Sequence, residues 1–231
     1  MSSLLEDLKK DNLLNVGLHS LRAVIAREVG LKNLSYTFND EFKQELSREH
    51  EKDNTGTDTV DNRLKYPFGY LVVNDMAPNK ERVPFKNIRR HGWNMGTSEA
   101  TYGTVQKSYL FPVILAVELH YFESSPAEAF LASQALMLFT GASAFSFDVA
   151  LGKGGIRYNN KIGFLDNVTI PMAEANLPSL PGGIELTLPF VFETHIGFVR
   201  DVFSVNSSEP TVTSFSVVTG TGQQTFDMKD T

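Results

Sequence analysis

Apolar and polar residues alternate most regularly between residues 184 and 198. This alternation is typical of a strand with one buried face. A typical strand has about 5–6 residues, so we expect this one to bend or to extend past its own core. Pro189 lacks a backbone N–H and predicts an edge or a bulge. A long edge with an apolar face needs a partner chain. The apolar face comprises Ile184, Leu186, Leu188, Phe190, Phe192, Ile196 and Phe198.

A strand and a helix are predicted before it. Residues 110–117 are apolar throughout, and alternation continues to Tyr121. Ser125-Pro126-Ala127-Glu128 predicts a helix start, with a serine cap, proline at the first position and glutamate at the third. The helix runs to about Phe139, is apolar on nearly every side, and has Gly141 placed to end it. We expect its own sheet or a neighbouring subunit to bury it, because it is too short to cross a bilayer.

The next segment predicts a hairpin. Residues 145–151 alternate as a strand, and a return strand covers about Lys161 to Ile170. The glycine-rich residues 152–155 between them suggest a phosphate-binding loop. However, the required spacing is missing, and no Ser or Thr follows Lys153. A hairpin turn is therefore favoured.

The rest of the chain completes the predicted fold. Residues 3–29 predict an amphipathic helix. We expect it to pack on its own sheet, and packing on a neighbour is the less favoured alternative. Residues 66–73 predict a strand. Residues 39–65 are charged and rich in turn formers, and their aspartates do not fit a calcium loop. Residues 201–231 predict a further strand, able to add to a neighbour's sheet, and a polar tail. We expect one α+β domain over 1–231, with both helices packed on a mostly antiparallel twisted sheet of core 66–200.

Charge and composition narrow the function classes. The chain has 231 residues, a net charge of −6 and no cysteine, which excludes disulfides and thiolate sites. No signal peptide is recognisable, so we expect assembly in a cytoplasm. Residues 66–109 are locally basic, and we consider three roles for them: contact with nucleic acid, contact with an acidic partner, or a solvated hairpin. The candidate contact residues are Lys86, Arg89, Arg90, Trp93, Phe190 and Phe192.

The sequence contains no catalytic or dinucleotide-binding motif. The five histidines are scattered and lack metal-binding spacing. His120 and His195 lie on polar strand faces, each two residues from a glutamate, Glu118 or Glu193. If these strands are neighbours, the four side chains form either a metal site or cross-strand charge pairs, and charge pairs are favoured. We therefore expect no enzyme, no cofactor and no metal.

The order of predicted elements resembles the tail terminators of tailed bacteriophages. The resemblance rests on the N-terminal helix, the strand opening Tyr66-Pro67-Phe68-Gly69, the basic stretch, the strand at 113–121, the Ser125-capped helix and the hairpin at 145–170. It covers about residues 1–200 and includes no diagnostic motif. It implies a ring, with six subunits as the expected number, that caps the tail tube and joins it to the neck. The charged segment 39–65 and the strand after Phe203 depart from compact members.

That resemblance implies a virion protein with the tail tube, and with sheath or neck proteins, as partners. DNA would pass through a negative lumen without specific binding. Two alternatives stay open. One is another neck or baseplate protein. The other is a monomeric ligand-binding or metal-dependent domain, whose mark would be a pocket containing both His120 and His195.

Overall fold

The computed structural model describes residues 12–38, 66–82, 89–94, 104–141, 144–151, 157–165, 168–175, 182–201, 214–219 and 222–227. The charged segment 39–65 and the glycine-rich residues 152–155 lie outside this part of the chain. The elements are α2 (Leu13–Val29), β1 (Leu34–Phe38), β2 (Phe68–Pro78), β3 (Arg89–Asn94), β4 (Thr104–Glu123), α4 (Pro126–Thr140), β5 (Ala144–Leu151), β6 (Arg157–Gly163), β7 (Met172–Glu174), β8 (Ile184–Asp201), β9 (Ser214–Thr219) and β10 (Gly222–Asp227).

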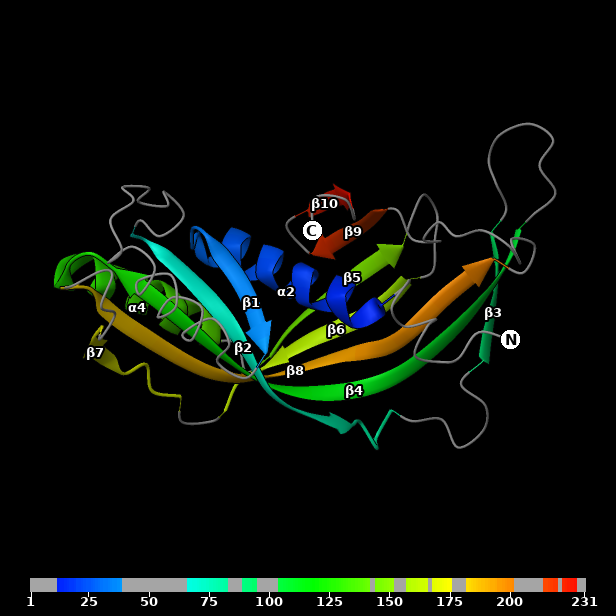
Figure 1. Ribbon diagram of the computed structural model, residues 1–231, viewed down its shortest axis with the longest axis horizontal. Helices are drawn as coiled ribbons and strands as arrows, with labels where there is room; N and C mark the ends of the chain where they lie inside the picture. The colour runs from blue at the N-terminus through cyan, green and yellow to red at the C-terminus, as the bar shows by residue number, and fades with distance from the viewer. Residues whose placement is uncertain are drawn as a thin grey trace, which may run out of the picture.

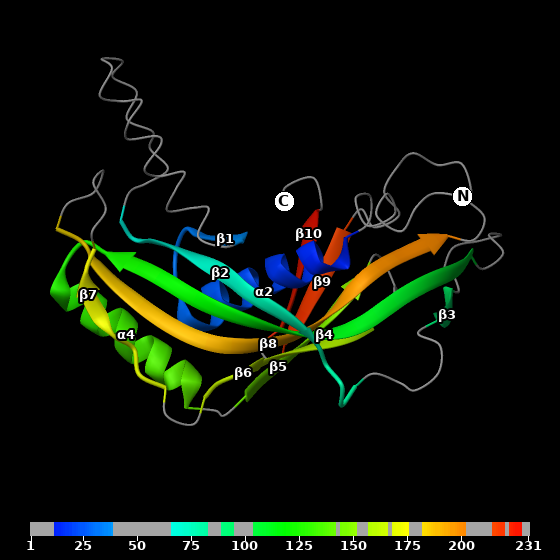
Figure 2. The same cartoon turned by 60° about the horizontal axis from the view of Figure 1, so that its bottom comes forward.

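These strands form one sheet in the order β1-β2-β4-β8-β6-β5-β9-β10, with β3 paired to β4 and β7 paired to β8. The pairing of β1 with β2 is parallel, and the other pairings within the described residues are antiparallel. The sheet twists and curls into an open half-barrel (Figures 1 and 2). The predicted α+β class, with a mostly antiparallel sheet and two helices on it, is confirmed.

The two longest strands, β4 and β8, run side by side along the whole sheet (Figure 1). They pair continuously from Gln106 with Asp201 to Glu123 with Ile184. On its other side β8 pairs with β7 and then with β6. The expectation that β8 forms a long unpaired edge was therefore wrong. Pro189 falls between the residues that pair with β7 and those that pair with β6, so no described strand pairs with it on that side, and the local edge predicted at Pro189 is confirmed.

Helix α2 packs its apolar stripe against the sheet. Asn12 caps it through a hydrogen bond from the Leu14 backbone N–H, and Gly30 ends it in the left-handed conformation with φ of 83°. The first predicted turns lie outside the described residues. At Gly17 the helix approaches β8 so closely that a Cβ would lie 2.7 Å from the Thr194 hydroxyl oxygen. The helix and the facing strand residues share one large apolar core.

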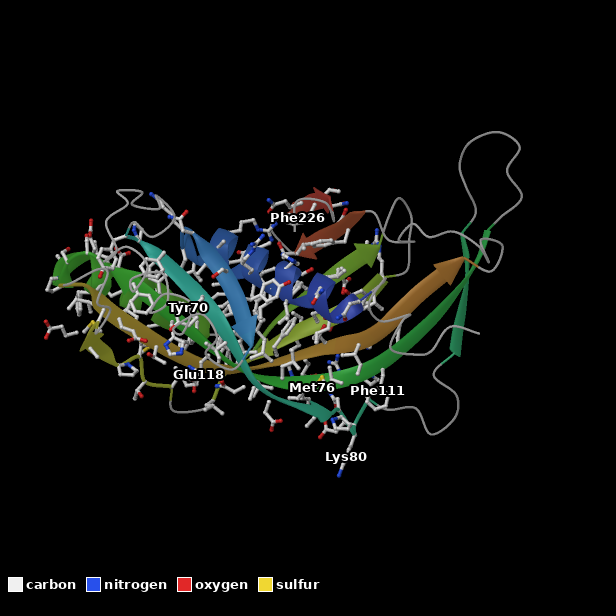
Figure 3. The ribbon with its side chains drawn as sticks, in the orientation of Figure 1. Tyr70, Met76, Lys80, Phe111, Glu118 and Phe226 are labelled. Carbon is white, nitrogen blue, oxygen red and sulfur yellow. The ribbon has the colours of Figure 1, made fainter. Side chains whose placement is uncertain are left out.

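The hairpin and the C-terminal strands extend the sheet beyond β8. β5 and β6 pair as the predicted hairpin, although β6 ends at Gly163 rather than near Ile170. β9 pairs with β5 of the same chain and places Phe215 and Val217 in the core. The predicted terminal strand thus adds to its own sheet. Part of the expected polar tail forms a further strand, β10, whose Phe226 (labelled in Figure 3) stacks on Phe215.

Candidate functional site

Helix α4 starts where local chemistry places it. The Ser125 hydroxyl accepts a hydrogen bond from the Glu128 backbone N–H at 3.3 Å. The Glu128 carboxylate in turn accepts from the hydroxyls of Ser124 at 2.6 Å and Ser125 at 3.3 Å. Pro126 occupies the first turn and Gly141 is the C-cap. These contacts confirm the predicted start and end of the helix.

The outer face of α4 is apolar and exposed. Only Ala129, Ser133 and Leu136 of this helix are buried. A set of four large apolar side chains, here called the α4 surface, faces outward: Phe130 is 55% exposed, Leu131 64%, Met137 49% and Leu138 83%. Of the two expected ways of burying α4, burial on most sides by its own sheet is wrong, because one sheet covers only one stripe of a helix. Burial by a neighbouring subunit stays a prediction. Such a surface is typical of a contact with another molecule.

A crevice of about 330 Å³ lies between the C-terminal end of α2 and the N-terminal half of α4. The residues with polar side chains in its lining are Glu123, Glu128, Tyr121 and Lys32. Burial, and secondarily the negative charge of Glu128, raises the pKa of Glu123 above its usual value. Leu131 belongs to both the crevice and the α4 surface, so the two features are continuous.

The opposite face of the sheet carries a histidine held by two glutamates. His120 Nδ1 lies 2.7 Å from Glu185 Oε1, and His120 Nε2 lies 3.5 Å from Glu118 Oε2. The His120 ring stacks on Tyr70 at a centroid distance of 5.0 Å. Figure 3 labels Tyr70 and Glu118 in this part of the sheet. Apolar contacts and cross-strand pairing account for the arrangement.

A second ionic cluster surrounds Glu193. Its carboxylate lies 3.2 Å from Arg82 Nε and 3.5 Å from Lys161 Nζ. It also accepts a hydrogen bond from the Asn79 side-chain amide at 3.2 Å. These contacts connect the residues that follow β2 with Glu193 on β8 and Lys161 on β6. Arg82 and Lys161 both pair with the Glu193 carboxylate, so the cluster links neighbouring parts of the sheet.

The hypothetical site of two histidines and two glutamates is not formed. β4 and β8 are neighbours as the hypothesis required, but Thr187 is the residue opposite His120. His195 is eight residues further along and pairs with Pro112, which places it roughly 26 Å away along the strand. Among the described residues, no three His, Asp or Glu side chains are grouped to hold a metal ion. His120 contacts Glu118 of its own strand and Glu185 of β8, and Glu185 was not among the predicted residues.

The six predicted contact residues fall into two groups. Phe190 and Phe192 are buried in the core, so their prediction as contact residues was wrong. Helix α2 covers the face of β8 that carries them, and Phe192 lies beside Gly17 of that helix. Arg89, Arg90 and Trp93 lie on β3, whose backbone pairs with β4. Their side chains, and the whole of Lys86, lie outside the described part of the chain.

The α4 surface was missing from the predicted contact residues, although its signal is present in the sequence. A helix with apolar residues on every side and Glu128 as its sole charge has more apolar surface than one sheet can bury.

Comparison with protein-family models and with curated proteins found no match for the chain. The fold and the α4 surface together define an α+β half-barrel protein with an exposed apolar helix. No helix of the described residues is long and apolar enough to span a membrane.

Proposed function

We propose that this chain is a structural virion protein of a tailed bacteriophage, a subunit of the tail terminator ring. In this function it caps the tail tube and joins the tail to the neck. The ring is a homo-oligomer, with six subunits as the expected number, and DNA passes through its lumen. The protein works by assembly rather than by catalysis.

The α4 surface is the observation that carries this proposal. Four large apolar side chains on one exposed helix face are unfavourable in water and are stabilised when another protein covers them. The element order that resembles tail terminators also supports it: the helix α2, the strand opening at Tyr66, the capped helix α4 and the β5–β6 hairpin. A neck or baseplate protein would use the same devices, and is the second candidate.

Within the described residues, the structure does not contain the pocket that the ligand-binding alternative predicts. That interpretation required one pocket containing both His120 and His195, and the strand register separates them. The crevice beside α4 contains neither histidine. Its polar groups are two carboxylates, a lysine and a tyrosine hydroxyl, without a nucleophile paired to a base.

The mass of the purified protein tests the proposal. Light scattering is measured across a concentration series, with and without tail tube protein. We expect either a closed ring of about six copies or smaller species that form rings when tube protein is added. A mass that stays constant and ignores tube protein would contradict the terminator function. Binding to baseplate proteins instead would favour the second candidate.

A further inference from the structure

We propose that the α4 surface binds the α4 surface of a second copy of this chain. The two helices lie antiparallel across a two-fold axis that passes near Gln134. This inference rests on the proposed function, because it names the partner of the surface on which that function depends. A two-fold contact closes on itself after two copies, so it joins subunits in pairs, and the head-to-tail contacts that close the proposed ring lie on other surfaces.

The α4 surface is symmetric about Gln134. Phe130 and Leu138 lie four residues before and after it, and Leu131 and Met137 lie three residues before and after it. Residues at these spacings share one face of a helix with Gln134, which is exposed. A two-fold rotation at Gln134 therefore places Phe130 of one copy opposite Leu138 of the other. It also places Leu131 opposite Met137.

The charge pattern permits this self-pairing. Glu128 is the only charged residue of α4. It lies six residues from Gln134, so the rotation sets it opposite the neutral Thr140. At 1.5 Å per residue, the two copies of Glu128 are roughly 18 Å apart along the helix axis, beyond strong repulsion. The two Gln134 amides meet at the axis, and each offers both donors and an acceptor to the other.

The other exposed apolar residues argue against a head-to-tail contact at the α4 surface itself. Within the described residues, the remaining large apolar side chains that are exposed are Met76, Leu165 and Met172. Leu165 follows Phe164, whose ring lies 5.3 Å from that of Phe139, a residue that packs against the core and is not part of the α4 surface. Met172 lies on the short strand β7. Met76 is isolated on β2, away from α4 (Figures 1 and 3). The described surface thus offers no second apolar patch of matching size, and the α4 surface is its own best complement.

The exposed area suits a pair of subunits. Four side chains of this size and exposure present on the order of 400–500 Å² of apolar surface. A typical monomer exposes no larger patch than roughly 300–600 Å². A standard interface buries about 800 Å² on each partner, of which about half is apolar. The α4 surface with a polar rim around it therefore matches the apolar core of one such interface.

Cysteine crosslinking tests the geometry, because the natural chain has no cysteine. We expect Gln134→Cys to form an intermolecular disulfide under mild oxidation, since the two copies of residue 134 meet at the axis. Ala127→Cys is the matched control, because Ala127 is exposed on the same stripe. Its two copies are roughly 21 Å apart, far beyond the roughly 4.4–6.8 Å Cα separation of a disulfide. Equal crosslinking of both variants, or none at residue 134, would overturn the proposal.

A matched pair of charge substitutions tests how strongly the two copies bind each other. Met137 and Met76 are equally exposed, at 49% and 50%. We expect Met137→Glu to weaken the pairing by at least about tenfold, because it places a carboxylate against Leu131 of the second copy. Met76→Glu should leave the pairing unchanged. Sedimentation equilibrium measures the dissociation constant of each variant, and circular dichroism checks that each one folds.

The two proposals fail in different ways. If the protein forms rings with tube protein while Gln134→Cys does not crosslink, the two-fold contact is wrong and the terminator function stands. If Gln134→Cys crosslinks and Met137→Glu gives monomers, but no ring forms with tube protein, the two-fold contact stands and the terminator function is wrong.

Discussion

Helices α2 and α4 are similar in length, at 17 and 15 residues, and contact the same core, yet they bury different shares of their apolar residues. Nine residues of α2 are buried, whereas only three of α4 are. The outer side of α2 carries charged residues such as Arg22 and Arg27, but the outer side of α4 carries Phe130 and Leu138. The apolar pattern of α2 matches one sheet. That of α4 exceeds it, and the proposed contact with a second copy would cover the remainder.

The largest contrast is expected from one leucine on each helix. Leu21 of α2 is fully buried, so Leu21→Ala should lower the free energy of unfolding by about 2–5 kcal/mol. Leu138 of α4 is 83% exposed, so Leu138→Ala should change it by less than about 0.5 kcal/mol in the separated subunit. Urea denaturation at low protein concentration measures both. Equal losses would show that α4 contributes to the folded subunit as much as α2 does.

The second contrast is in the pH dependence of stability. Helix α2 contains a buried histidine, whereas the α4 surface has no titratable group. Burial, and secondarily the positive charge of Arg22, lowers the pKa of His19 from 6.5 to about 4. Its Nε2 lies 3.0 Å from the Tyr36 hydroxyl. The unfolded state takes up a proton first as the pH falls. Stability should therefore be full above pH 6.5 and fall toward pH 4, by roughly 2–3 kcal/mol.

Chemical denaturation at a series of pH values measures this effect, with His19→Gln as the comparison. The variant should lose the part of the pH dependence that lies between about pH 6.5 and 4. An identical slope in both proteins across this window would show that His19 is not the group that titrates.

The smallest expected effect concerns how closely α2 packs against β8 at Gly17. In isolated helices alanine is favoured over glycine by roughly 0.5–1 kcal/mol. At Gly17, however, a new Cβ would lie 2.7 Å from the Thr194 hydroxyl oxygen, so we expect Gly17→Ala to cost about 1–3 kcal/mol instead. Thr194→Ala removes that oxygen, and the double variant should recover much of the loss. Additive effects in a double-mutant cycle would refute the close contact.

The comparison also explains which parts of the site were predictable. The ends and the apolar character of α4 follow from Ser125, Glu128 and Gly141, whose effects act within one turn. The alternation in β8 correctly predicted which residues share a face. Phe190 and Phe192 were nevertheless assigned to a contact surface, because alternation does not reveal what covers a face. The core contacts of these two residues come from α2 and β5–β6, which are distant in sequence.

The sequence by itself determined the class of fold, the start and end of α4 and the hairpin. These features depend on residues within a few positions of one another or on a repeating period. Only the tertiary structure decided that β8 lies inside the sheet, that β9 joins its own chain and that His120 and His195 are apart. Strand order and register are set by pairing between distant segments, and no local pattern encodes them. The exposure of α4 was decided the same way, because one sheet can cover only one side of a helix.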